Sequence, residues 1–155
     1  RHNLHNVYRV PEIIMDVFLN YLPEAIQSHF FSTLVNRDIP GGNNLYTVFY
    51  HNSISIMLCR DGKLQVIQNF DFINADDCIY HLLNVCKGFD VVGNSVNLHI
   101  SGMIDKRSGL YSAVNKYFLH TVFDELPTGF TYTDAVKEQP PHFFSSLFHL
   151  ATCVS

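Results

Sequence analysis

The fold is decided between residues 45 and 72, which read LYTVFYHNSISIMLCRDGKLQVIQNFDF. Residues 45–50 and 54–58 are rich in aromatic and β-branched side chains, which favour strands. The dipeptide Asp61-Gly62 is typical of tight hairpin turns, and after it apolar residues alternate with polar ones. The segment therefore predicts a three-stranded antiparallel meander.

Downstream of the meander the pattern predicts helices that alternate with strands. Asn74 can cap a helix that ends at Gly88, and Ser108 can cap a second helix. Residues 95–100 and 121–123 are predicted as strands on either side of that second helix. Strand four follows a helical crossover, so it should lie parallel to strand one. The resulting α/β domain has a five-stranded mixed sheet with strand order 3-2-1-4-5 and helices on both faces.

The last part of the chain is predicted as a loop followed by a closing helix. Residues 127–141 are expected to form the loop because prolines and polar residues interrupt any periodic pattern. Phe143, Leu147 and Leu150 have helical spacing. We expect the apolar face that they form to dock on the sheet.

The first 44 residues have a different pattern. An extended run, 6–10, precedes a helix over 11–22 with one buried stripe, made of Ile14, Val17, Phe18 and Tyr21. A second helix is predicted over 28–35, and Pro40-Gly41-Gly42 interrupts it. We therefore place a boundary at residue 44. Residues 1–44 supply an N-terminal strand and helices, as the tail of a preceding lobe or a linker, and residues 45–155 form the sheet-containing lobe.

Composition excludes several classes of function. The formal net charge is −4, so the chain lacks the basic field that attracts nucleic acid or anionic membranes. No stretch reaches the ~18 apolar residues of a membrane span. The four cysteines, Cys59, Cys78, Cys86 and Cys153, are too irregularly spaced for a disulfide framework, so buried thiols are predicted. We expect a cytoplasmic protein whose partner is another protein, and composition leaves the oligomeric state open.

Three segments carry a resemblance to a known family: residues 64–70 (LQVIQNF), 76–83 (DDCIYHLL) and 100–104 (ISGMI). They resemble an uncharacterised bacterial family with an actin-like ATPase fold, and the likeness extends to residues 8–11 and 141–143. The resemblance implies a ribonuclease H-like (actin-like ATPase) lobe that corresponds to the C-terminal half of a two-lobed protein. The start at Arg1 agrees with that reading. The family supplies no activity that could be carried over.

The same resemblance indicates where a nucleotide site would lie. Actin-like ATPases hold phosphates with hairpins that typically carry Asp and Gly, and the equivalent turn here is His51-Asn52-Ser53, which has neither. It is either a plain turn or a degenerate anion site. Ser101-Gly102 matches half of the adenosine-binding signature, although a strand-to-helix turn also requires a flexible residue. These five residues are the candidate cofactor-binding positions.

No catalytic residues are predicted. A ribonuclease H-type nuclease would need acids on the first strand, which has none, and Asp76 and Asp77 begin a helix, where acids serve as caps. The nine histidines form no HExxH motif, so no metal site is expected. The leading hypothesis is a non-catalytic interaction or scaffold module without a cofactor. The alternative is a nucleotide-binding protein that takes ATP with Mg²⁺ and requires a second lobe.

Overall fold

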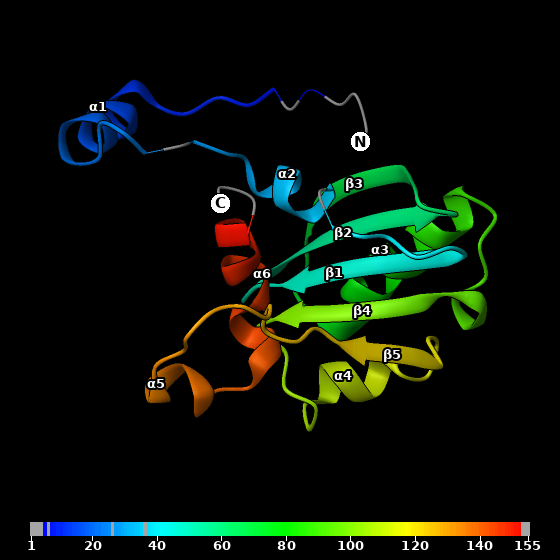
Figure 1. Cartoon of the computed structure of the whole chain (residues 1–155). Coiled ribbons are helices and arrows are strands. Elements are labelled where there is room, and N and C mark those ends of the chain that lie inside the picture. Colours follow the sequence, from blue (N-terminus) through cyan, green and yellow to red (C-terminus); the bar gives the residue numbers. More distant parts are fainter. Residues whose placement is uncertain (1–4, 6, 26, 36, 153–155) are drawn as a thin grey trace.

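The computed structural model describes residues 5, 7–25, 27–35 and 37–152 (Figure 1). Six helices and five strands are described. In chain order they are α1 (Glu12–Tyr21), α2 (Phe30–Val35), β1 (Asn43–Phe49), β2 (Ser53–Arg60), β3 (Lys63–Asp71), α3 (Ala75–Gly88), β4 (Asn97–Gly102), α4 (Gly109–Val114), β5 (His120–Phe123), α5 (Asp134–Lys137) and α6 (Pro141–Thr152). A single 3₁₀ turn, Gly93–Ser95, precedes β4.

The sheet has the predicted order, β3-β2-β1-β4-β5. β1, β2 and β3 are antiparallel neighbours, whereas β4 runs parallel to β1, and β5 runs parallel to β4. The turn between β2 and β3 has positive φ at both Asp61 (49°) and Gly62 (73°), as a tight hairpin with a right-handed twist requires. The predicted meander and the parallel crossover are both confirmed.

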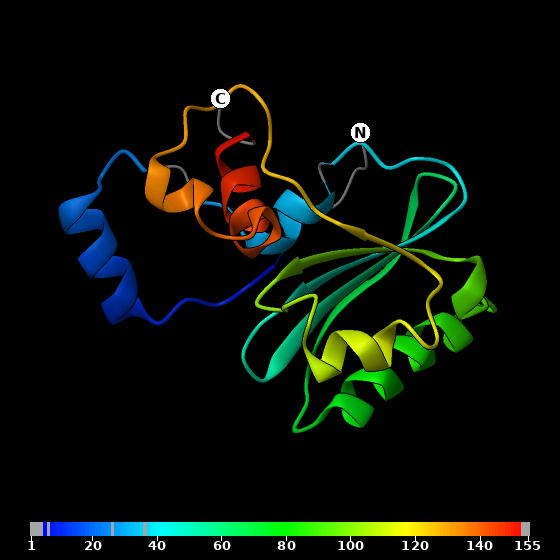
Figure 2. The ribbon, with the colours of Figure 1, turned by 90° about the horizontal axis from the view of Figure 1, so that it is seen from below.

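Helices cover both faces of the sheet (Figure 2). α3 and α4 lie on one face, where Leu82, Leu98 and Phe118 belong to the larger hydrophobic core. α2 and α6 lie on the other face, where Leu34 packs with Tyr46 in a smaller core. The central strands β1 and β2 are buried along nearly their whole length because both of their faces are covered.

The predicted helix caps are present. The Asn74 side chain accepts a hydrogen bond from the Asp77 amide at 2.9 Å, and Asp77 accepts one from the Ile73 amide at 3.1 Å. Ser108 accepts from the Tyr111 amide at 3.1 Å. These bonds satisfy amides that the first helical turn leaves without partners, so they fix where α3 and α4 begin.

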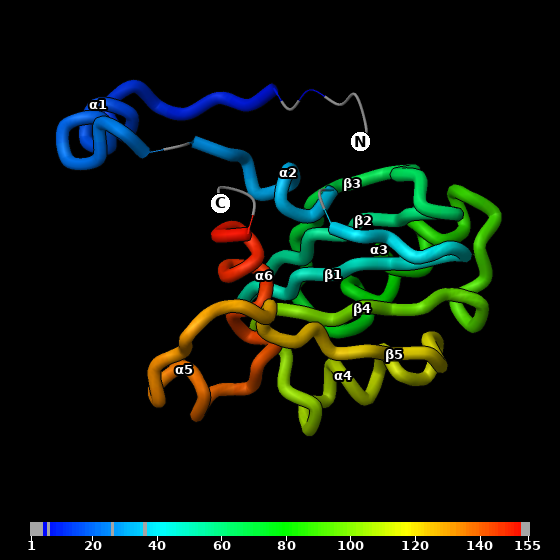
Figure 3. Tube along the Cα trace, viewed as in Figure 1, coloured from blue at the N-terminus to red at the C-terminus, as the bar shows by residue number. Residues whose placement is uncertain are grey.

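The N-terminal segment departs from the expected packing. α1 forms where predicted, but none of its residues is buried, so the predicted buried stripe is wrong. The cause is its position, because α1 stands apart from the sheet at the end of an arm that runs out and returns to α2 (Figures 1 and 3). Residues 7–10 form no strand, and residue 6 lies outside the described residues. The division at residue 44 stays a prediction.

The C-terminal segment also differs from the prediction. The expected loop over 127–141 contains the short helix α5, and its last residue, Pro141, begins α6. α6 docks through its polar side, because its buried residues are His142, Ser145 and Ser146, whereas Leu147 is 59% exposed. The expected docking through the apolar face is therefore wrong. In the described part of the chain, no helix combines the length and apolar character that crossing a membrane requires.

Candidate functional site

The turn His51-Asn52-Ser53 closes the hairpin between β1 and β2. The Tyr50 amide donates to the Ser53 carbonyl at 2.8 Å, and the Asn52 carbonyl accepts from the Phe72 amide at 3.0 Å. His51 and Asn52 are exposed. The backbone bonds that hold this turn thus belong to the sheet itself. Assignment of the three residues to a nucleotide site stays a prediction.

Ser101 and Gly102 end β4 in close contact with β1. The Ser101 hydroxyl is buried and donates to the Thr47 carbonyl at 3.0 Å. Gly102 has φ of 83°, and a Cβ atom there would lie 2.2 Å from the Phe49 carbonyl oxygen. The register pairs Phe49 with Gly102. The structure therefore brings the two predicted segments to the same end of the sheet, where β1 and β4 finish. Packing between these two strands accounts for both Ser101 and Gly102.

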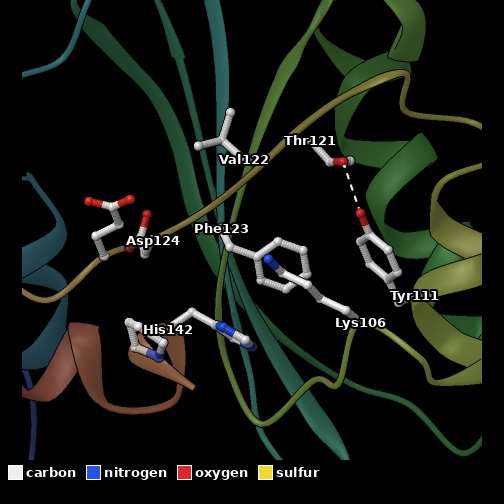
Figure 4. Close-up of a pocket in the computed structure, with 9 residues that line it drawn as sticks. Lys106, Tyr111, Thr121, Val122, Phe123, Asp124 and His142 are labelled. Carbon is white, nitrogen blue, oxygen red and sulfur yellow. Dashed lines mark hydrogen bonds between the residues drawn. The ribbon is translucent and has the colours of Figure 1, made fainter. Parts of the chain in front are cut away.

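A hollow of about 440 Å³ lies beside β5, the outermost strand on this side of the sheet (Figure 4). Side chains from the loop after β4, from α4, from β5 and from the start of α6 meet here. The lining residues are Lys106, Tyr111, Thr121, Val122, Phe123, Asp124, Glu125, Pro141 and His142.

His142 anchors α6 at this hollow. Its Nε2 lies 2.8 Å from the Ile104 carbonyl oxygen, so Nε2 must carry the proton and donate it. The imidazole is 3% exposed and meets the Phe123 ring edge-on, with the ring centroids 4.4 Å apart. Burial lowers the pKa of His142, and the bond to Ile104 acts in the opposite direction. The neutral imidazole thus holds α6 against the loop after β4.

Charged groups surround the rest of the hollow. The Lys106 Nζ lies 4.5 Å from the centroid of the Phe123 ring, within range of a cation–π contact (Figure 4). Asp124 accepts a hydrogen bond of 2.8 Å from Nη1 of Arg37, which lies on the opposite side of β5. Glu125 adds a second carboxylate. The hollow can therefore receive a polar molecule.

The described residues hold neither a cluster of metal ligands nor an activated thiol. No group of three or more His, Cys, Asp or Glu side chains is placed to hold a metal among the positions that the structure describes. Cys59, Cys78 and Cys86 are free and buried, as expected, and burial raises their pKa values to about 11, 12 and 11. Such thiols are poor nucleophiles. Cys153 lies outside the described residues.

Several residues of this edge were not singled out from the sequence. Asp124 could have been identified from the sequence, because it directly follows a predicted strand, 121–123, and polar residues at the ends of parallel strands often form sites. Arg37 had no such signal, and His142 stood only in the segment 141–143 to which the family resemblance extends. Their roles depend on contacts with segments 38 and 87 residues away along the chain.

The chain is similar to known proteins in both sequence and structure. Residues 1–121 match the family described as "Protein of unknown function (DUF3822)". A solved structure from Bacteroides thetaiotaomicron VPI-5482, described as a protein with actin-like ATPase fold and unknown function, is similar with a TM-score of 0.72 and 18% sequence identity. The match covers 93% of this chain and 52% of that chain, so the present chain spans about half the length of the solved relative. No curated protein matches significantly.

These matches confirm the fold and the resemblance inferred from the sequence. At 18% identity the structural likeness establishes the fold alone, which is an actin-like ATPase lobe. The family match covers well over half of the 155 residues. The chain therefore belongs to the family of proteins of unknown function DUF3822.

Proposed function

We propose that this lobe is a non-catalytic interaction module that binds another protein through α1. The observation that carries the proposal is the exposure of α1, where Ile13 is 75%, Val17 53% and Phe18 52% exposed. A helix with several exposed apolar side chains in water is costly unless a partner covers it. Helices of this kind commonly bind apolar grooves of other proteins.

A groove beside α1 supports the proposal. It has a volume of about 770 Å³ and lies between the N-terminal arm and α6. Tyr8, Phe18, Leu147 and Leu150 are among its lining residues, and most of the lining is apolar. The apolar face of α6 that does not dock on the sheet thus faces α1 across an open groove. A partner that filled the groove would cover both helices.

The test is affinity purification of the full chain from its own cells, with quantitative comparison of variants. Phe18→Asp places a charge in the apolar surface and should remove the bound protein. Tyr80→Asp is the matched control, because Tyr80 is 63% exposed on α3, on the other side of the molecule. A partner retained by Phe18→Asp would contradict the proposal.

Binding of ATP with Mg²⁺ is the second candidate, and the proximity of the hairpin 51–53 to Gly102 favours it. Because this candidate requires a second lobe, thermal unfolding of the two-lobed protein with millimolar ATP and Mg²⁺ separates the two functions. A ligand at 100 times its dissociation constant should stabilise the lobe by ~2.7 kcal/mol. We expect no saturable shift, and a shift that saturates would favour nucleotide binding.

A further inference from the structure

α2 and α6 cover one face of the sheet (Figure 2). A second hollow is lined by residues of these two helices and of the sheet beneath them. Its volume is about 460 Å³. Thr33 and Arg37 come from α2 and the segment after it, Tyr46 and His99 from β1 and β4, and His149 from α6. This hollow is separate from the one described above, although Asp124 connects them through Arg37.

Three polar atoms at this hollow are buried and have no hydrogen-bond partner. They are Oγ1 of Thr33 and the Nε and Nη2 atoms of Arg37. Within the described part of the chain, no other buried side-chain nitrogen or oxygen lacks a partner. A buried polar group without a partner costs roughly 1–3 kcal/mol, and more if it is charged. Thr33 and Arg37 both line this one hollow, so a molecule bound there would be next to the residues whose polar atoms need partners.

The free edge of Arg37 has the geometry of an oxyanion receptor. Its Nη1 is occupied by Asp124 at 2.8 Å, which leaves the Nε–H and one Nη2–H side by side in the guanidinium plane. This pair forms the fork that carboxylates and phosphates accept with two oxygens. The guanidinium carbon also lies 5.7 Å from the centroid of the Tyr46 ring. Asp124 and Tyr46 therefore hold the fork in position before any ligand arrives.

Neighbouring side chains support the same arrangement. Tyr46 stacks on His99 with centroids 4.3 Å apart and an interplanar angle of 14°, and His99 bonds Asn44 at 3.2 Å. Burial lowers the pKa values of His99 and His149, so both rings are neutral near pH 7. Asp38 also lines the hollow, but it is exposed, and water screens its charge. The charge of Asp124 is already paired with Arg37.

We propose that this hollow binds a compact oxyanion, with two coplanar oxygens on Nε and Nη2 of Arg37 and a further bond from the Thr33 hydroxyl. The three donor atoms are shielded from bulk water, so the side chains that cover them must shift to admit a ligand, and a small ligand requires the smallest shift. Inorganic phosphate and a small carboxylate share this chemistry. The site is independent of the protein contact proposed for α1, since the two share no lining residue.

The experiment measures thermal unfolding of the full chain in buffer without oxyanions. Inorganic phosphate, acetate and chloride are titrated at matched ionic strength, and the first two distinguish a phosphate from a carboxylate ligand. We expect a saturable rise in melting temperature with phosphate or acetate beyond that with chloride. Thr33→Val, which keeps the shape and removes the hydroxyl, should weaken binding about tenfold. Without ligand it should be at least as stable as the parent, because an unpaired buried hydroxyl is removed.

Two further variants complete the design. Thr131→Val is the matched control, because Thr131 is exposed and does not line the hollow, and it should bind as the parent does. Arg37→Lys keeps the charge but lacks the fork, so it should abolish the response. If Arg37→Lys does not fold, the oxyanion affinity of Thr33→Val still tests the proposal. The absence of a saturable response beyond chloride, or an equal response in Thr33→Val, would overturn the proposal.

Discussion

Gly102 shows how one backbone position can look like part of a ligand site and yet be required by packing. Its φ lies in the region that favours glycine, and its Cα faces the backbone of Phe49, on the neighbouring strand. Any side chain would collide with a carbonyl oxygen that cannot move without breaking the β1–β4 pairing. The glycine therefore needs no nucleotide to explain it.

We predict that Gly102→Ala is destabilising by about 3 kcal/mol or more, because strain at positive φ adds to a backbone collision. Gly129→Ala is the control. Gly129 also has positive φ, at 91°, but a Cβ atom added there would meet no other atom within 4 Å, so only about 1–2 kcal/mol of strain is expected. Denaturant unfolding of both variants measures the difference. Equal losses would mean that the β1–β4 contact is looser than described.

The buried histidines make stability depend on pH. Burial lowers the pKa values of His99, His142 and His149 below 6.5 in the folded state. The unfolded chain then binds protons first as the pH falls, so folding stability is complete above about pH 6.5 and declines below it. Unfolding free energies at pH 7.5, 6.5 and 5.5 should decrease in that order. His142→Gln should reduce the slope, whereas the exposed His120→Gln should not.

At the scale of single elements, the helix α3 is the firmest prediction from sequence. Its cap, its apolar stripe and its end are all local features, and Leu82 on the stripe is completely buried. Leu82→Ala should cost ~2–5 kcal/mol, because the core that surrounds it can collapse only partly into the cavity. Ile73→Ala, at a position 95% exposed, should cost less than about 0.5 kcal/mol. Chemical denaturation compares the two, and a loss below about 1 kcal/mol at Leu82 would contradict the described packing.

For α1 and α6 the sequence predicted the helix but not which of its faces, if any, is buried. The spacing of Ile14, Val17 and Phe18 correctly predicted a helix, but periodicity cannot tell whether an apolar face meets the chain's own core or another molecule. In α6 the docking side carries His142 and Ser145, whose polar groups are satisfied by the carbonyls of Ile104 and of His142 itself. The His142 bond is a tertiary contact and the Ser145 bond lies within the helix, and hydropathy registers neither, so hydropathy alone predicted the wrong face.

For the whole molecule, strand order was predictable because each step depended on neighbours in the sequence. Hairpin turns joined β1, β2 and β3, and helical crossovers made β4 and β5 parallel to β1. The two hollows were not predictable. Arg37, Asp124 and His142 meet only after the sheet has formed and the helices have packed on both of its faces. No motif within a short window contains them.

The ion pair between Arg37 and Asp124 also has a kinetic consequence. It joins positions 87 residues apart, with the side chains only 11% and 9% exposed, whereas the β1–β3 hairpins close over short loops. Closing a long loop costs chain entropy before its contacts repay it, so the hairpins should form in the folding transition state and the ion pair afterwards.

Asp124→Asn should therefore leave the refolding rate nearly unchanged. A buried pair that loses one partner costs about 3 kcal/mol, which would appear as roughly 100-fold faster unfolding. Stopped-flow refolding and unfolding across a range of denaturant concentrations would measure both rates. A slower refolding rate in this variant would place the ion pair in the folding nucleus. With the expected result, the ion pair between Arg37 and Asp124 slows unfolding and so lengthens the lifetime of the folded lobe, and it leaves the folding rate unchanged.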